Sequence, residues 1–295
     1  MSHSRAQVIF GAVGTGALCL WAATWLLLSH REQPYNGKSL SAWTDQYEKY
    51  WAAAPKSPDW AKRGEAEAAI RHIGTNAIPR LLAWVGVRDS PLKTQLLALS
   101  RRQKILKLPL RPAAYYHLKG HMGFMALGTV AKPGASDGQV SVEGMVMEGV
   151  GKPAASGLIE LLHDKDTEVR ATATVCLCSF APDAKDAVPA LVQALNEAGK
   201  GDFALINSSI LALGIIHAEP DLVVPLLVEY VNGARKDCGH SLTAIVALGC
   251  YKEKAQSAVP AVLAYLNKAD ATQRVVINTV LRDLDPEGPT QGLGH

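Results

Sequence analysis

Apolar residues return along the C-terminal half of the chain at the three- and four-residue intervals of amphipathic helices, and prolines interrupt this pattern regularly. Pro153, Pro189, Pro225 and Pro260 each precede an apolar run, at intervals of 36, 36 and 35 residues. Proline suits the first position of a helix, because its missing N–H would have no intrahelical partner there. We therefore predict a helix start at each of these four prolines.

A second amphipathic segment lies between successive prolines. Each of these segments opens at an aspartate that can cap a helix, and the intervals are 36, 35 and 33 residues for Asp166, Asp202, Asp237 and Asp270. Two of the segments close on Ala-Leu-Gly, at 212–214 and 247–249, where glycine can take the left-handed conformation that ends a helix. The predicted unit is an Asp-started helix, a short turn and a Pro-started helix, repeated about every 35 residues as in solenoid proteins.

The repeat pattern weakens toward the N-terminus. Residues 66–85 contain a helical run, Gly74 and a second run that starts at Pro79, which predicts one more helix pair. Residues 134–146 are too rich in glycine for a partner helix and are either an insertion or a degenerate repeat. The boundaries that we predict are an anchor at 1–30, a capping helix at 31–58, degenerate repeats at 59–150, regular repeats at 151–288 and a disordered tail at 289–295.

The motif Asp166-x-x-Val169-Arg170, followed by Ala187-Val188-Pro189-x-Leu191, resembles the HEAT repeat over residues 151–285. The resemblance implies paired helices stacked in a right-handed superhelix. It also implies that Asp166 and Arg170 join a ladder of polar contacts between neighbouring repeats.

The middle repeats depart from this family pattern. Arg274 matches Arg170, but Ile206 and Ser241 occupy the equivalent positions between them. The resemblance therefore implies a polar ladder that is interrupted in the middle of the stack.

The N-terminal segment has a different composition. No charged residue occurs from Ala6 to Ser29, and residues 8–28 supply 21 positions, about the 20 that a helix needs to cross a bilayer. The residues that follow offer no small-x-small cleavage site, so we predict a single uncleaved transmembrane anchor. Because a short N-terminal tail usually stays in the cytoplasm, we expect the repeats on the periplasmic or extracytoplasmic side.

An aromatic stretch follows the predicted anchor. Ser41 is a candidate helix cap, and Trp43 and Tyr47 fall on one side of the helix that it would start. These rings form either a binding stripe or a cap over the open end of the repeats, and the cap is favoured because terminal repeats must differ from internal ones. The spacing of Tyr35, Gly37, Leu40 and Trp43 resembles that in anchored bacterial HEAT proteins, which adds an expectation of architecture only.

Candidate chemistry is sparse. His117 and His121 lie four apart and could share a helix face, but Gly120 lies between them and no glutamate is near. Ser90 and Lys93 match Ser-x-x-Lys without the companion motifs of penicillin-recognising enzymes. The cysteines at 176, 178, 238 and 250 suit small core residues, since no local pair meets disulfide geometry. We predict no catalytic residue, cofactor or metal.

Charge is distributed unevenly. No acidic residue occurs from Ser90 to Ser136, whereas eight basic residues do, and the rest of the chain carries 22 basic and 27 acidic side chains. Leucines are interleaved with these charges, which suggests a helix that buries one face and exposes the other. The candidate residues for binding an anionic surface are Lys93, Arg101, Arg102, Lys104, Lys107, Arg111 and Lys119.

These patterns predict an all-α protein, a HEAT-like α-α superhelix (solenoid) preceded by one N-terminal transmembrane helix. Three functions stay open. The favoured one is a membrane-anchored, non-catalytic scaffold that binds a protein partner through its concave surface. The alternatives are a binder of lipid headgroups or nucleic acid through residues 93–119, and a HEAT-like enzyme acting on DNA bases or bilin chromophores, for which no catalytic group is identifiable.

Overall fold

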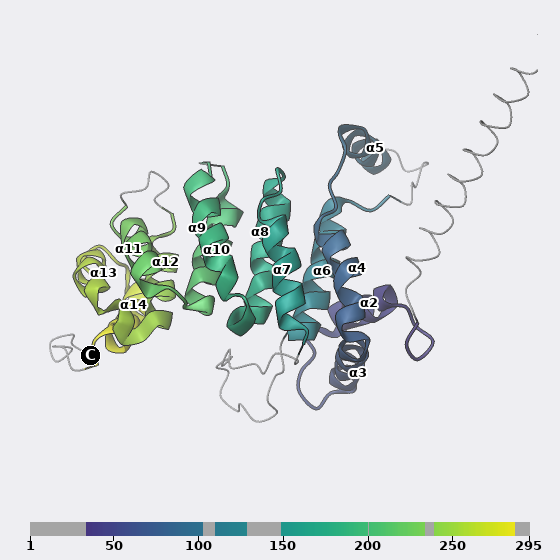
Figure 1. The fold of residues 1–295 in the computed structure, drawn as a ribbon, viewed down its shortest axis with the longest axis horizontal. Coiled ribbons are helices and arrows are strands. Elements are labelled where there is room, and N and C mark those ends of the chain that lie inside the picture. Colours follow the sequence, from purple (N-terminus) through teal and green to yellow (C-terminus); the bar gives the residue numbers. More distant parts are fainter. Residues whose placement is uncertain (1–33, 103–109, 129–148, 200, 234–238, 287–295) are drawn as a thin grey trace, which may run out of the picture.

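The fold is a row of packed helices. The computed structural model describes residues 34–102, 110–128, 149–199, 201–233 and 239–286, and within these ranges the chain is helical with no β-strand. Figure 1 shows the helices standing side by side from the α2 end to the α14 end, as in an α solenoid. The all-α prediction is confirmed.

The helix bounds follow the predicted pairs. In chain order the α-helices are α2 (Leu40–Tyr50), α3 (Pro58–Ile73), α4 (Ile78–Val85), α5 (Pro91–Arg102), α6 (Ala113–Gly128), α7 (Gly151–Leu161), α8 (Thr167–Leu177), α9 (Val188–Glu197), α10 (Phe203–Ile216), α11 (Pro220–Val231), α12 (Ser241–Tyr251), α13 (Val259–Leu266) and α14 (Ala271–Leu284). Short 3₁₀ segments join some of them: η1 (Gly74–Ala77), η2 (Cys178–Asp183), η3 (Lys185–Ala187) and η4 (Lys252–Ala258).

The helices form two rows. In the first row, α6, α8, α10, α12 and α14 each contact the next member. The second row holds α4, α7, α9, α11 and α13, and each of these packs against the first-row helix that follows it in the chain. One core of buried apolar side chains runs between the rows, and each unit contacts mainly its neighbours.

Three of the four predicted proline positions are confirmed. Pro189 and Pro260 are the second residues of α9 and α13, and Pro153 is the third residue of α7. All three lie in a first turn, where the lost N–H breaks no helical hydrogen bond. Pro79 likewise occupies the second position of α4.

The prediction for Pro225 is wrong, because Pro225 lies inside α11. Helix α11 begins five residues earlier at Pro220, after Glu219 takes a left-handed conformation with φ of 49°. The 3₁₀ segments η3 and η4 precede α9 and α13. In the α11 unit, by contrast, the residues before Pro225 are already part of the α-helix. The N–H that Pro225 lacks would have bonded to the Asp221 carbonyl, and both residues are exposed, so water can satisfy that oxygen.

The aspartates at the starts of the first-row helices behave differently from one another. Asp166 and Asp270 are N-caps whose side chains accept backbone N–H groups, and Asp270 forms a capping box with Gln273. Asp202 holds the N-cap position of α10 but accepts from Gly199 instead. Asp237 lies outside the described residues.

The Ala-Leu-Gly triplets do not end their helices as predicted. Gly214 and Gly249 lie inside α10 and α12, and His217 takes the left-handed conformation after α10. A Cβ atom at Gly214 would lie 2.8 Å from the Cα of Ala247 in the next first-row helix. These glycines therefore permit close approach of neighbouring helices. The prediction that they end their helices in a left-handed conformation did not include this role.

Polar contacts link successive turns between the repeats. Arg88, after α4, forms an ion pair with Asp164, after α7. Arg170 donates to the Asp164 carbonyl at 2.8 Å, and its guanidinium lies 3.9 Å from the Asp202 carboxylate of the next turn. Burial opposes ionisation of Asp164, but the hydrogen bonds from Arg88 and from the Asp166 backbone N–H, together with the charges of Arg88 and Arg170, outweigh it and lower the pKa of that carboxyl.

The expected role of Asp166 in this ladder is wrong, since Asp166 caps its own helix and Asp164 makes the pair. Arg274 resembles Arg170 in one respect: each donates to a backbone carbonyl ahead of its own helix, that of Ala269 for Arg274. In the middle repeats, Thr243 donates to Asn207 at 2.9 Å and joins α12 to α10.

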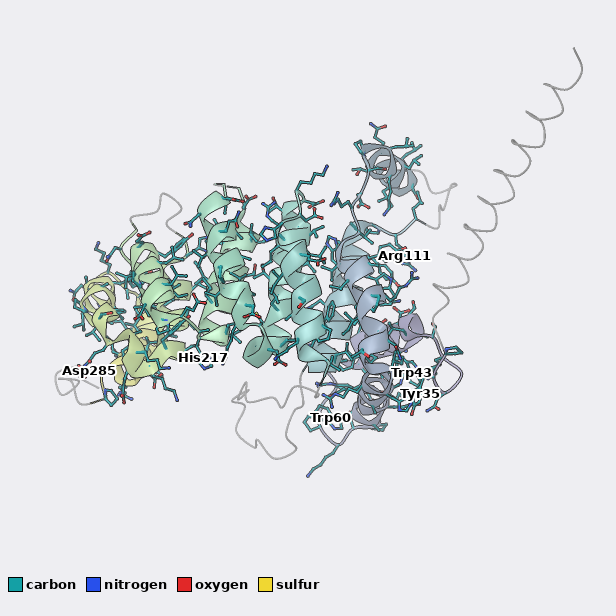
Figure 2. The ribbon with its side chains drawn as sticks, in the orientation of Figure 1. Tyr35, Trp43, Trp60, Arg111, His217 and Asp285 are labelled. Carbon is teal, nitrogen blue, oxygen red and sulfur yellow. The ribbon has the colours of Figure 1, made fainter. Side chains whose placement is uncertain are left out.

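The aromatic stretch for which we predicted a cap over the repeats forms helix α2. Trp43 and Tyr47 of α2 are buried against α3 and α6 at one end of the rows. The hydroxyl of Ser39, not that of Ser41, caps α2 by accepting from Ala42. Figure 2 shows Tyr35, Trp43 and Trp60 gathered at this end.

Three predictions fall on residues that the structure leaves undescribed. The transmembrane segment at 8–28, the insertion at 134–146 and the tail at 289–295 all lie outside the described residues. Among the helices that are described, none combines the length and the apolar character needed to cross a membrane.

Candidate functional site

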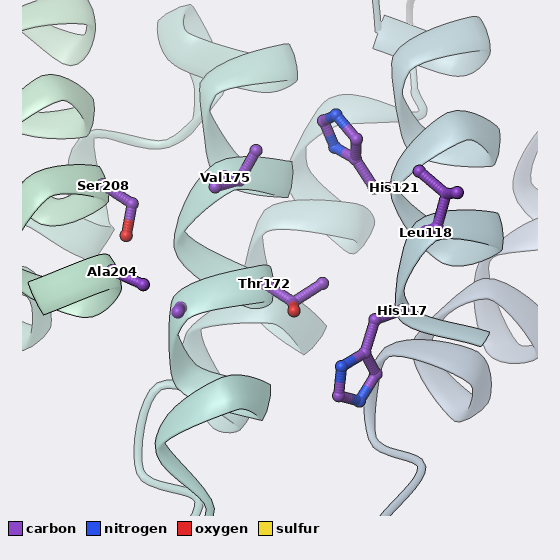
Figure 3. Close-up of a pocket in the computed structure, with 8 residues that line it drawn as sticks. His117, Leu118, His121, Thr172, Val175, Ala204 and Ser208 are labelled. Atoms are coloured by element: carbon purple, nitrogen blue, oxygen red, sulfur yellow. The ribbon is translucent and has the colours of Figure 1, made fainter. Parts of the chain in front are cut away.

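A shallow groove lies on the first row, between α6, α8 and α10. Its volume is about 240 Å³. Figure 3 shows lining side chains from three helices: His117, Leu118 and His121 from α6, Thr172 and Val175 from α8, and Ala204 and Ser208 from α10. Ala171 of α8 also lines the groove. We call this the shared groove.

The hydroxyl groups of the shared groove are satisfied within their own helices. Thr172 Oγ1 donates to the Glu168 carbonyl at 2.7 Å, and Ser208 Oγ donates to the Leu205 carbonyl at 3.1 Å. Their methyl and methylene groups are left to face the groove together with Leu118 and Val175. The surface therefore offers apolar contact more than hydrogen bonding.

Exposed aliphatic side chains extend this apolar surface along the first row. Val175 of α8, Leu211 of α10 and Val246 of α12 are between 36% and 38% exposed. They lie 36 and 35 residues apart, and Leu211 and Val246 each precede an Ala-Leu-Gly triplet. Because they occupy the same position in successive units, these three residues form what we call the first-row stripe.

His121 is the polar group of the groove that lacks a full set of partners. Its Nδ1 atom is buried and has no hydrogen-bond partner within the described part of the chain. Burial lowers the pKa of His121, because an imidazolium would lose its hydration there.

His117 and His121 do share the α6 face, as their spacing suggested. However, His117 Nε2 lies 2.7 Å from the Val87 carbonyl, so this ring is engaged in tying α6 to the preceding turn. No group of three His, Cys, Asp or Glu side chains among the described residues could hold a metal ion. Gly120 between them serves packing, since a Cβ there would lie 2.7 Å from Val85 of α4.

The predicted basic surface is not one continuous patch, and the assignment of Lys119 to it is wrong. The side chain of Lys119 is only 3% exposed, and its Nζ atom lies 2.6 Å from Asp45 Oδ1 and 2.6 Å from Ser41 Oγ. The ammonium also lies 5.2 Å from the centre of the Trp84 ring. Lys119 thus joins α6 to α2 through an ion pair and a cation–π contact.

Lys93 is also occupied by a contact within the protein. Its Nζ atom lies 2.6 Å from Asp89 Oδ1, one turn away. Asp89 also accepts from the backbone N–H of Ala113, at 3.0 Å to each carboxylate oxygen. Burial favours the neutral acid, but the hydrogen bonds from Lys93 and Ala113 prevail and lower the pKa of Asp89.

The other members of the predicted basic set are distributed as follows. Arg111 is exposed, with its guanidinium 4.9 Å from the centre of the Tyr115 ring. Arg101 and Arg102 form the last turn of α5, and Lys104 and Lys107 lie outside the described residues. The structure therefore separates Lys119 from Arg101 and Arg102, which the sequence had grouped together.

Lys119 and Ser41 are the arrangement most like a nucleophile beside a base. The Lys119 nitrogen also donates to Asp45, and an ammonium in such a pair has no lone pair to accept the Ser41 proton. The geometry therefore suits positioning of α2 against α6, and Lys119 does not act as a base toward Ser41.

Two of the cysteines confirm the expectation of core residues. Cys176 is buried and Cys178 is half-buried in the packed core, and burial raises the pKa of the Cys178 thiol to about 12. Cys250 is exposed as a residue, although burial of its thiol still raises the pKa. Such thiols are poor nucleophiles, because the thiolate is the reactive form.

The sequence interpretation missed the first-row stripe. A signal for it was available, since Leu211 and Val246 immediately precede the triplets and Val175 lies 36 residues before Leu211. Periodicity alone could not separate them from the core, because each has buried neighbours on both sides.

Comparison of the chain with protein-family models, with curated proteins and with solved structures gives no match in any of the three.

Proposed function

We propose that this protein is a non-catalytic HEAT-like repeat scaffold that binds a protein partner along the first row of helices. The observation that carries this proposal is the first-row stripe of Val175, Leu211 and Val246, which continues the apolar surface of the shared groove. Burying such residues against a partner is favourable, and regular spacing lets one elongated ligand contact several units.

The chemistry of the groove suggests the kind of partner. Leu118 and Val175 line the groove and can accept the apolar side chains of a ligand. An amphipathic helix presents apolar residues at intervals of three, four and seven, which suits a groove that spans α6, α8 and α10. We therefore favour an amphipathic helix over a flat globular surface as the ligand.

The N-terminal segment supports a location for this scaffold. We propose that residues 8–28 anchor the chain in a membrane and that the repeats lie on its periplasmic or extracytoplasmic side, on the basis of hydropathy and tail length. Binding to the concave surface of the superhelix stays a prediction, and the first-row stripe is the surface that we propose should be tested first.

Site-specific photo-crosslinking tests the proposed surface. A crosslinking residue placed at Val175, Leu211 or Val246 of the full chain in its native membrane should capture one and the same partner. Leu222 of α11 and Leu263 of α13 are the matched controls, because they are similarly exposed on the second row. Capture from these controls but not from the stripe would contradict the proposal.

A binding measurement completes the test once the partner is identified. Val175→Asp and Leu211→Asp together should weaken binding of the purified partner by tenfold or more, because a carboxylate in an apolar interface loses its hydration. The variant Leu222→Asp and Leu263→Asp should bind as the parent does. Circular dichroism should show the same helix content for both variants.

A further inference from the structure

Helix α5 stands apart from both rows (Figure 1). It occupies the turn between α4 and α6, where the other repeats have short connections, and none of its described side chains is buried. Leu92, Leu96 and Leu99 share one face by their spacing of four and three, yet Leu92 is 66% exposed and Leu99 is 42% exposed. Within the described residues, the core of the two rows thus leaves this apolar helix face uncovered.

The base of α5 is held firmly although its apolar face is uncovered. Ser90 caps the helix by accepting from the Lys93 backbone N–H. Asp89 bonds to both Lys93 and Ala113, so the residues before α5 and at the start of α6 are joined at one point. The helix is therefore presented to its surroundings from a fixed position on the row.

The charge of α5 has one sign. The helix contains Lys93, Arg101 and Arg102 and no acidic residue, and it belongs to the stretch from Ser90 to Ser136 that contains none. Arg111, just before α6, adds an exposed positive charge. A short helix that combines exposed leucines with basic residues has the composition of helices that lie in the membrane interface.

We propose that α5 docks along the surface of a membrane that contains anionic lipid, with Leu92, Leu96 and Leu99 below the headgroups. Arg101 and Arg102 would attract anionic headgroups, whereas Lys93 stays paired with Asp89, and the leucines would leave water. Nucleic acid fits less well, because a phosphate backbone would satisfy the charges but leave the leucines exposed to water. The surface differs from the first-row stripe, so the two proposals stand or fall separately.

Hydrogen exchange of the full chain tests this inference, because its readout is local to residues 91–102. The protein is mixed with vesicles of phosphatidylcholine alone, or of phosphatidylcholine with phosphatidylglycerol. Exchange of the α5 amides should slow only with phosphatidylglycerol, and the protection should fade at high salt. Arg101→Gln with Arg102→Gln should weaken this docking roughly 25-fold, at about fivefold for each basic residue.

A second pair of variants tests the apolar face. Leu92→Gln with Leu99→Gln should abolish the protection, whereas Leu222→Gln with Leu263→Gln, at exposed leucines of the second row, should leave it unchanged. Equal α5 exchange with and without phosphatidylglycerol would overturn the proposal, even if the N-terminal segment binds both kinds of vesicle. Protection of α5 by duplex DNA but not by vesicles would overturn it in favour of nucleic acid.

Discussion

The two ends of the molecule are held together by different kinds of contact. Around α2, α3 and α6, buried aromatic rings and the Lys119–Asp45 ion pair join helices that are not equivalent in sequence. From α8 to α14, small residues at equivalent positions let neighbouring helices touch, as Gly214 touches Ala247. The comparison teaches that a structural repeat can be recognised from the sequence only where the same helix–helix contacts recur from unit to unit.

The largest expected effect comes from the regular end. Leu213→Asp, at a fully buried position of α10, should lower the free energy of unfolding by about 4 kcal/mol or more, because the carboxylate has no partner there. Leu211→Asp is the control, since that neighbouring side chain is exposed and should cost little. Chemical denaturation measures the difference.

Hydrogen exchange sharpens this test of the regular end. Because α10 contacts both α8 and α12, the loss of protection in Leu213→Asp should spread to both neighbours. Faster exchange confined to α10 would show that the units are independent and would contradict nearest-neighbour coupling.

At the irregular end, the two partners of one ion pair should differ in cost. Asp45→Ala leaves the buried Lys119 charge without its carboxylate and should cost about 3 kcal/mol. Lys119→Met leaves Asp45, which is 50% exposed, in contact with water and should cost about 1 kcal/mol or less. Equal losses in urea denaturation would mean that Lys119 is not buried as described.

Alanine substitutions at two glycines should change the stability by smaller amounts and in opposite directions. Gly214→Ala should destabilise the protein by about 1–3 kcal/mol, because the new Cβ would lie 2.8 Å from Ala247 and force α10 and α12 apart. Gly64→Ala, at an exposed position of helix α3 with no atom within 4 Å of the new Cβ, should stabilise it by up to about 1 kcal/mol. Thermal denaturation of both variants should show shifts of opposite sign.

The smallest effect concerns pH. The pKa of His121 is lowered in the folded state by burial, so the unfolded chain binds a proton first as pH falls. The stability contributed by the neutral ring is complete above the unfolded pKa of about 6.5 and is lost as pH falls from there toward the folded pKa. His121→Leu should show a flatter decline of stability between about pH 7 and pH 5, and an unchanged slope would rule out this role.

Sequence patterns predicted the regular end well for a physical reason. Proline and capping aspartate act within one turn of helix, so Pro189, Pro260 and Asp270 could be placed without knowledge of the tertiary structure. The same logic failed at Pro225, where Pro220 and a left-handed Glu219 started the helix earlier. Local rules name suitable positions, but they do not decide between two prolines in one segment.

The candidate surfaces were harder to predict, because exposure depends on residues distant in sequence. Lys119 resembled Arg111 as a basic residue in a basic segment, yet Asp45 lies 74 residues away and buries it. Val175 resembled a core residue, yet neither row covers it. The sequence shows the charge and hydropathy of each residue. Only the fold shows which distant residues cover a side chain and which side chains are left exposed.

The junction at Asp89 has a consequence for how this chain can change. The Asp89 carboxylate holds residues 93 and 113 together, so the segment between them leaves the row and rejoins it at the same point. Lengthening a closed loop costs little, about 0.6 kcal/mol for each doubling, so this segment can be exchanged or shortened while α4 and α6 keep their packing. The proposed docking of α5 on a membrane and the stability of the stack can therefore change independently of each other.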